Sequence, residues 1–110
     1  MSFASYRDLR VWQGGIELVQ YIYALTKTFP NSETYALASQ MQRAAVSVPS
    51  NIAEGYARSG AKENVRFIAI SQGSLAELDT QLEIARRLGY LTADEHQRLQ
   101  SKLIALSKQL

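Results

Sequence analysis

The chain has 110 residues and a formal net charge of +2, with 46% hydrophobic and 20% charged residues, as in one ordinary globular domain. Cysteine is absent, which excludes disulfides, thiolate nucleophiles and cysteine-ligated metal clusters. No apolar run approaches the roughly 20 residues that cross a bilayer, and the first residues lack the apolar stretch of a signal peptide. We therefore expect a single cytoplasmic domain over residues 1–110 that has no membrane partner.

Proline and glycine divide the chain into four segments with helical periodicity. In the first segment, for example, Trp12, Ile16 and Val19 recur at intervals of three and four residues. Thr92 and Glu95 are spaced as a capping box at the start of the last segment. The predicted helices are residues 7–29, 32–58, 61–89 and 92–110. Short connections favour antiparallel neighbours, so the sequence predicts an all-α, up-down-up-down four-helix bundle.

Two features disturb these predicted helices. Gly14-Gly15 lies in the first, where each glycine costs about 1 kcal/mol against alanine. Pro49 lies within the second and removes one backbone hydrogen bond. Either feature predicts a kink; alternatively, the second helix breaks, and Ser47 caps a new segment that begins near Pro49.

Two uncharged stretches, residues 44–53 and 67–76, suggest self-association. A helix with one side in water is expected to carry a charge every turn or so, and ten residues are nearly three turns. A second copy of the chain would cover these helices, since obligate interfaces resemble a core cut in half. The alternative is a mildly polar, alanine-rich surface that faces water.

A polar stripe follows the second predicted helix. At 100° per residue the following side chains share an arc of about 100°: Arg43, Ser47, Ser50, Asn51, Glu54 and Arg58. One interpretation is a structural network of Arg43, Ser47, Asn51 and Glu54, with Glu77 reaching it from the third helix. If Glu54 is buried against an arginine, its loss costs about 3–5 kcal/mol. The other interpretation is a contact with a ligand or nucleic acid.

The sequence contains no catalytic constellation. His96, the one histidine, follows Glu95 in a first helical turn and is predicted to be a solvated surface residue. A di-iron bundle requires Glu-x-x-His pairs, and the chain has none. Its glycines form no phosphate-binding loop. We therefore expect no enzyme activity, no metal site and no cofactor.

The predicted topology separates the charges along the bundle. One end collects an excess of positive charge, and the other is slightly negative. The cations assigned to the positive end are Arg7, Arg10, Arg58, Lys62, Arg66, Lys102 and Lys108. Such a surface attracts phosphate backbones, and its binding weakens with salt; alternatively, it serves solubility. Five of these residues are the candidate phosphate contacts: Arg7, Arg10, Arg58, Lys62 and Arg66.

Several runs of residues resemble a known family. They include Leu9-Arg10-Val11-Trp12-Gln13, the run from Arg43 to Gly55 (Arg-Ala-Ala-Val-Ser-Val-Pro-Ser-Asn-Ile-Ala-Glu-Gly) and Gly73-Ser74-Leu75-Ala76-Glu77-Leu78. They are similar to the bacterial four-helix-bundle family of ribosomal-RNA intervening-sequence proteins, and to the accessory variability proteins of diversity-generating retroelements. The resemblance implies a ring-shaped homopentamer with a nucleic-acid role. Gly14-Gly15 departs from the pattern, which predicts better helix formers at these positions.

Together these observations predict a non-enzymatic, ring-forming scaffold that binds RNA or DNA or associates with ribosomal RNA. The alternative is a protein-interaction adaptor for a larger enzyme, such as a reverse transcriptase, with little nucleic-acid contact.

Overall fold

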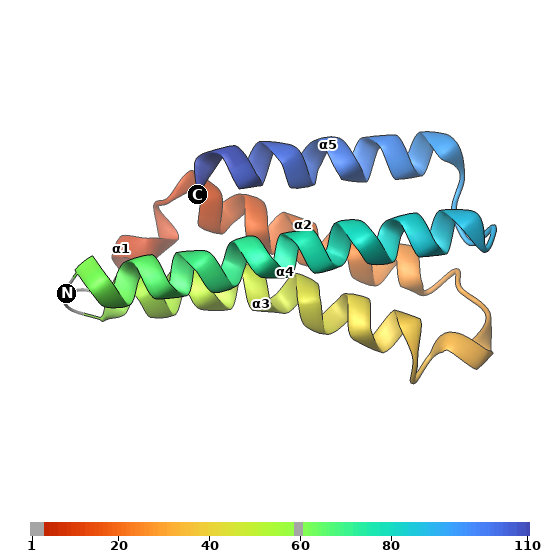
Figure 1. The fold of residues 1–110 in the computed structure, drawn as a ribbon, viewed down its shortest axis with the longest axis horizontal. Helices are drawn as coiled ribbons and strands as arrows, with labels where there is room; N and C mark the ends of the chain where they lie inside the picture. Colours follow the sequence, from red (N-terminus) through yellow and green to blue (C-terminus); the bar gives the residue numbers. More distant parts are fainter. Residues whose placement is uncertain (1–3, 59–60) are drawn as a thin grey trace.

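The computed structural model describes residues 4–58 and 61–110, and within them it is all-helical, without strands (Figure 1). Four long helices form the predicted bundle, with successive helices antiparallel. The elements are α1 (Ala4–Arg7), α2 (Arg10–Thr26), the 3₁₀ helix η1 (Asn31–Glu33), α3 (Leu37–Ala57), α4 (Ala61–Arg87) and α5 (Ala93–Gln109). None of the helices in the described ranges is both long and apolar enough to cross a membrane.

The bundle is 44 Å long and 25 by 21 Å across, so its two ends are well separated. Side chains from α2, α3 and α4 fill its centre, and Ile22, Met41 and Leu78 are fully buried there. Burying a side chain of this size stabilises the fold by about 1.5–3 kcal/mol. Among the pairs of long helices that contact one another, α3 with α4 has the most extensive contact and α2 with α5 the least.

The first predicted helix, 7–29, is wrong at both ends. The chain breaks the helix after Arg7, because Leu9 is extended (φ −74°, ψ 129°), and α2 begins at Arg10. Gln13 Nε2 donates to the carbonyl of Arg7 at 2.8 Å and so satisfies a carbonyl at this break. At the other end α2 stops at Thr26, where the Thr26 hydroxyl donates to the Ile22 carbonyl at 2.9 Å.

The second predicted helix begins at Leu37, not at residue 32. Residues Asn31–Glu33 form one 3₁₀ turn, and the Glu33 carboxylate accepts a hydrogen bond from the Tyr90 hydroxyl at 2.7 Å. This tertiary contact spans 57 residues of sequence, so a local pattern could not predict it. The third helix ends at Arg87, not at residue 89, and the fourth runs from Ala93 to Gln109. The capping box of Thr92 and Glu95 is confirmed.

The predicted disturbances at Gly14-Gly15 and Pro49 do not interrupt either helix. The alternative in which α3 breaks near Pro49 is wrong, because α3 continues from Leu37 to Ala57. The two features instead meet: a Cβ at Gly15 would lie 3.1 Å from the Pro49 Cβ. Glycine at this position therefore lets α2 approach the proline ring on α3.

Candidate nucleic-acid interface

Five predicted phosphate contacts come together at one end of the bundle. Arg7 ends α1, Arg10 begins α2, and Arg58 follows α3. Lys62 and Arg66 lie in the first turns of α4, and the described side chains of all five are exposed. Figure 1 shows α1, the C-terminal end of α3 and the start of α4 at the same end. We call these five side chains the basic end.

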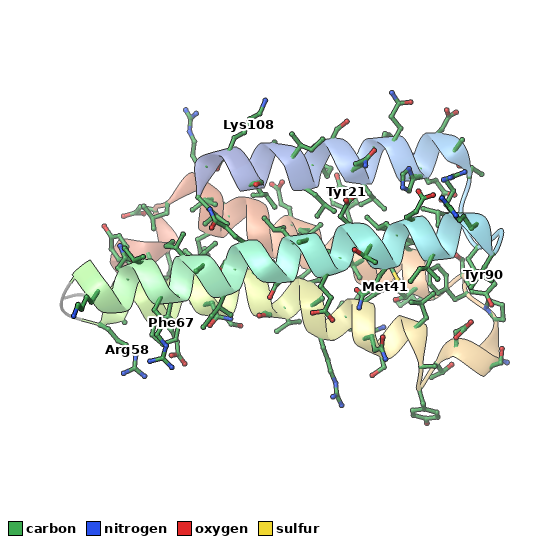
Figure 2. All side chains as sticks on the ribbon, viewed as in Figure 1. Tyr21, Met41, Arg58, Phe67, Tyr90 and Lys108 are labelled. Atoms are coloured by element: carbon green, nitrogen blue, oxygen red, sulfur yellow. The ribbon has the colours of Figure 1, made fainter. Side chains whose placement is uncertain are left out.

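Aromatic rings hold three of these arginines in place. The guanidinium carbons of Arg58 and Arg66 lie 5.1 and 5.5 Å from the centre of the Phe67 ring. Figure 2 shows Arg58 and Phe67 near each other at this end of the bundle. Arg7 lies 5.3 Å from the centre of the Trp12 ring. An exposed cation–π contact contributes about 0.5–1 kcal/mol. These contacts already restrict the arginine side chains, so that binding to a phosphate costs less side-chain conformational entropy.

Gly55 on α3 positions the shared ring of Phe67. A Cβ at Gly55 would lie 2.9 Å from the Phe67 Cβ and 3.1 Å from the Asn64 Oδ1. The absence of a side chain allows α4 to pack closely against the end of α3, and Phe67 is buried there. The last residue of the Arg43-to-Gly55 run thus supports the two arginines that flank the ring.

Glu54 is not the buried partner that the polar stripe predicted. Its carboxylate lies 3.5 Å from Arg58, and both side chains are 56% exposed. An exposed pair one helical turn apart contributes about 0–1 kcal/mol. The predicted cost of 3–5 kcal/mol for losing Glu54 therefore does not hold for the single chain.

Hydrogen bonds join only part of the predicted network within one chain. The Asn51 amide donates to the Ser47 hydroxyl at 2.9 Å, and the Ser74 hydroxyl donates to the same oxygen at 2.8 Å. Arg43 is exposed and forms no ion pair with any residue described in 4–58 or 61–110. Glu77 is exposed and accepts a hydrogen bond from Gln81 at 3.2 Å.

Sequence reasoning missed two serines on α4 as partners of α3. Ser74 bonds to Ser47, and Ser71, which is fully buried, donates to the Val48 carbonyl at 3.0 Å. The available signal was their spacing of three residues, which places both on one face of α4. These bonds fix the register of α4 against α3, and therefore the position of Phe67.

The opposite end of the bundle carries a cluster around Glu83. Its carboxylate accepts hydrogen bonds from Arg86 at 2.7 Å and from Arg87 at 2.8 Å. The hydrogen bond from Arg86, followed by that from Arg87, lowers the pKa of Glu83 to about 2. His96, predicted to be solvated, has a side chain that is only 12% exposed, and its Nε2 lies 3.3 Å from Glu83. That prediction was wrong because α5 packs this turn against α4.

Lys102 does not belong to the basic end, contrary to the prediction from topology. Its ammonium lies 4.5 Å from the centre of the Tyr21 ring, in the middle of α2. Figure 1 shows α5, which carries Lys108 near its end, finishing before the tip formed by α3 and α4. The other five predicted cations lie at the ends of α1 and α3 and the starts of α2 and α4.

The model of the 23S rRNA-intervening sequence protein family matches residues 7–110. No curated protein sequence matches. A crystal structure from Bacteroides thetaiotaomicron VPI-5482, of a protein of unknown function from the S23 ribosomal protein family, has a similar fold. It superposes with a TM-score of 0.83 at 20% identity, over 90% of this chain and 89% of that one. The chain belongs to the 23S rRNA-intervening sequence protein family.

Proposed function

We propose that this protein is a non-enzymatic scaffold that binds RNA through the phosphate backbone, using the basic end. The observation that carries the proposal is the convergence of five cations at the ends of four helices, three of them held against aromatic rings. Such a surface favours phosphates over bases, because the rings of Trp12 and Phe67 are already covered by arginine side chains. Binding of this kind depends on charge more than on sequence.

The scaffold acts as a ring of identical chains, a homopentamer if it follows the assembly implied by its family resemblance. Support comes from exposed apolar side chains on α3 and α4: Val46, Ile70 and Ile84 are 40%, 39% and 44% exposed. Arg43 and Glu77 lie on neighbouring helices, and neither has an opposite charge to pair with in the described chain. A second copy would cover the apolar side chains and pair these charges, and a ring would multiply the basic end into one positive face.

Salt dependence of RNA binding tests this proposal. Each neutralised phosphate contributes about −0.7 to −0.9 to the slope of log affinity against log salt. Changing Arg58, Lys62 and Arg66 together to glutamine is expected to make the slope shallower by about 2 to 3, as measured by filter binding of a structured RNA at several salt concentrations.

The matched control removes three charges from the opposite end: Lys27→Gln, Arg87→Gln and Arg98→Gln. It has the same change in net charge, and its slope is expected to stay within experimental error of the wild-type value. Equal slopes for both triple variants would contradict the assignment of the basic end. Binding that is weak and insensitive to salt in the wild type would instead favour the alternative, an adaptor that contacts a larger enzyme.

A further inference from the structure

A groove opens between α2 and α5, away from the basic end. The two helices meet where Leu106 covers Gly14, since a Cβ at Gly14 would lie 2.7 Å from the Leu106 Cδ2. Figure 1 shows that they diverge from there toward the start of α5. The resulting groove has a volume of about 520 Å³, which lies within the range of small-molecule sites.

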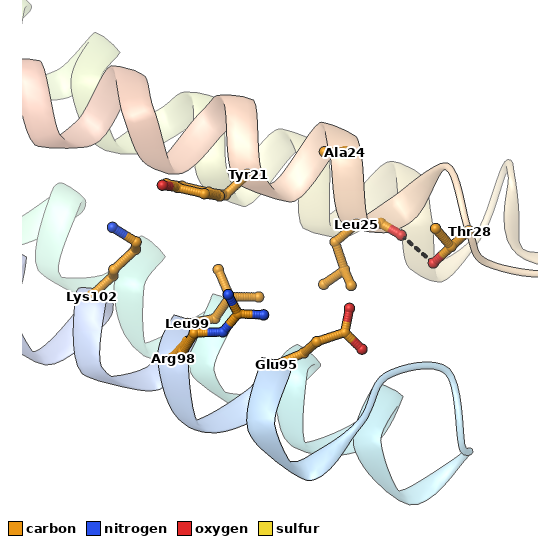
Figure 3. A pocket seen from close by; sticks show the side chains of 8 residues that line it. All are labelled: Tyr21, Ala24, Leu25, Thr28, Glu95, Arg98, Leu99 and Lys102. Atoms are coloured by element: carbon orange, nitrogen blue, oxygen red, sulfur yellow. Dashed lines mark hydrogen bonds between the residues drawn. The ribbon is translucent and has the colours of Figure 1, made fainter.

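The floor of the groove is apolar. Leu25 from α2 and Leu99 from α5 form it, and both are more than 90% buried (Figure 3). Ala24 lines the α2 side, and its methyl group is the smallest side chain of the lining. Tyr21, which is 48% exposed, closes one end with its ring. These groups would shelter an aliphatic or aromatic body from water.

Two cations lie along the α5 side of this floor. Arg98 and Lys102 are four residues apart, so both lie on one face of α5, and Figure 3 shows both side chains at the groove. Neither forms an ion pair with any carboxylate of the described residues. The one carboxylate in the lining, Glu95, accepts a hydrogen bond from the Thr92 backbone at 2.8 Å as part of the capping box. The lining therefore has an excess of positive charge beside an apolar floor.

We infer that this groove binds a small organic anion. The apolar body of the ligand lies on Leu25 and Leu99, and its carboxylate or sulfonate pairs with Arg98 and Lys102. The contact of Lys102 with Tyr21 keeps the ammonium at the groove when no ligand is present. This site is independent of the proposed RNA contacts, because none of its lining residues belongs to the basic end.

Fluorescence titration with 8-anilinonaphthalene-1-sulfonate tests the site. We expect saturable binding of one probe per chain and displacement of the probe by octanoate. Octanol, which has the same chain length without the charge, is expected to compete about tenfold less well, because it gains no charge-assisted contact. Absence of saturation, or equal competition by octanol and octanoate, would overturn the inference.

Substitution of the two cations tests whether the organic anion binds in this groove. Arg98→Gln with Lys102→Gln is expected to weaken octanoate binding about tenfold, since two charged contacts at a partly exposed rim are lost. The control, Arg10→Gln with Lys108→Gln, removes one arginine and one lysine outside the groove and is expected to leave binding unchanged. An equal effect of the two double variants would show that the anion responds to net charge alone, and would contradict the site.

Ala24→Phe fills the groove without altering its charges. Ala24 is exposed, so the bundle is expected to keep its helical content by circular dichroism while the octanoate affinity falls at least tenfold. Unchanged affinity in this variant would overturn the inference. A change in the mass of the assembly by light scattering would also overturn it, because the groove would then be an interface between copies of the chain.

Discussion

At the scale of single residues, several positions of the Arg43-to-Gly55 run serve packing between helices. Pro49 meets Gly15 on α2, and Gly55 leaves room for Phe67 on α4. The hydroxyl oxygen of Ser47 accepts hydrogen bonds from the Asn51 amide and from the Ser74 hydroxyl. The physical requirement at these positions is a small or rigid group at a close helix contact, and so the run carries information about the fold more than about a catalytic site.

Two adjacent glycines give a prediction at this scale. Gly15→Ala is expected to leave the protein about 1 kcal/mol or more less stable than Gly14→Ala does, because its new Cβ meets the rigid Pro49 ring, at 3.1 Å from the proline Cβ. Gly14→Ala is expected to be close to neutral. Its Cβ meets only the flexible end of Leu106, and alanine recovers about 1 kcal/mol of helix propensity. Chemical denaturation measures both, and equal stabilities would contradict the packing role of Gly15.

At the scale of the elements, side chains at the helix ends decide where the helices begin and stop. The capping box of Thr92 and Glu95 was predictable, because both of its bonds lie within four consecutive residues. The start of α3 was not, because Glu33 is engaged by Tyr90, which lies 57 residues further along the chain. The junction of α4 and α5 has both a local and a tertiary contact. Glu83 accepts hydrogen bonds from Arg86 and Arg87 within three to four residues, and it also lies beside His96 of α5.

The Glu83 cluster predicts a specific dependence of stability on pH. The pKa of Glu83 is lowered to about 2 in the folded chain, against 4.5 for the free group, through hydrogen bonds from Arg86 and Arg87. A lowered pKa stabilises the fold above pH 4.5, and this contribution is lost as the pH falls toward 2. The difference in melting temperature between wild type and Glu83→Gln is therefore expected to shrink from pH 6 to pH 2.

Glu17→Gln is the control for this measurement, since it removes an exposed carboxylate that forms no ion pair with the described residues. If the melting temperatures of wild type and Glu83→Gln differ by the same amount at both pH values, the stabilising role of the cluster is wrong.

At the scale of the whole molecule, the proposed function depends on assembly. The uncharged stretches of α3 and α4 leave Val46 and Ile70 at the surface of the single chain. Arg43 and Glu77 lie beside them without an opposite charge inside the described chain. Pairing across a subunit boundary would account for both observations, because a desolvated charge needs a partner.

Charge reversal tests this assembly. Light scattering is expected to give a multiple of the chain mass of 12.3 kDa for the wild type, and five copies for a pentamer. Arg43→Glu and Glu77→Arg are each expected to lower the mass, because like charges would face one another, and the double variant is expected to restore it. A wild-type chain that stays at 12.3 kDa at high micromolar concentration would contradict both the ring and the multiplied basic end.

The all-helical class, the antiparallel order and the position of five cations at one end could be predicted from the amino-acid sequence: Arg7, Arg10, Arg58, Lys62 and Arg66. Periodicity, capping and short connections are local signals, and they suffice to place residues along a bundle. Packing between the helices, which local signals do not encode, sets which of these arginines lie against aromatic rings, places Lys102 at the groove and leaves Glu54 exposed. These outcomes depend on the angles and distances between the helices. Close contacts, such as Gly15 with Pro49 and Gly14 with Leu106, set those angles and distances.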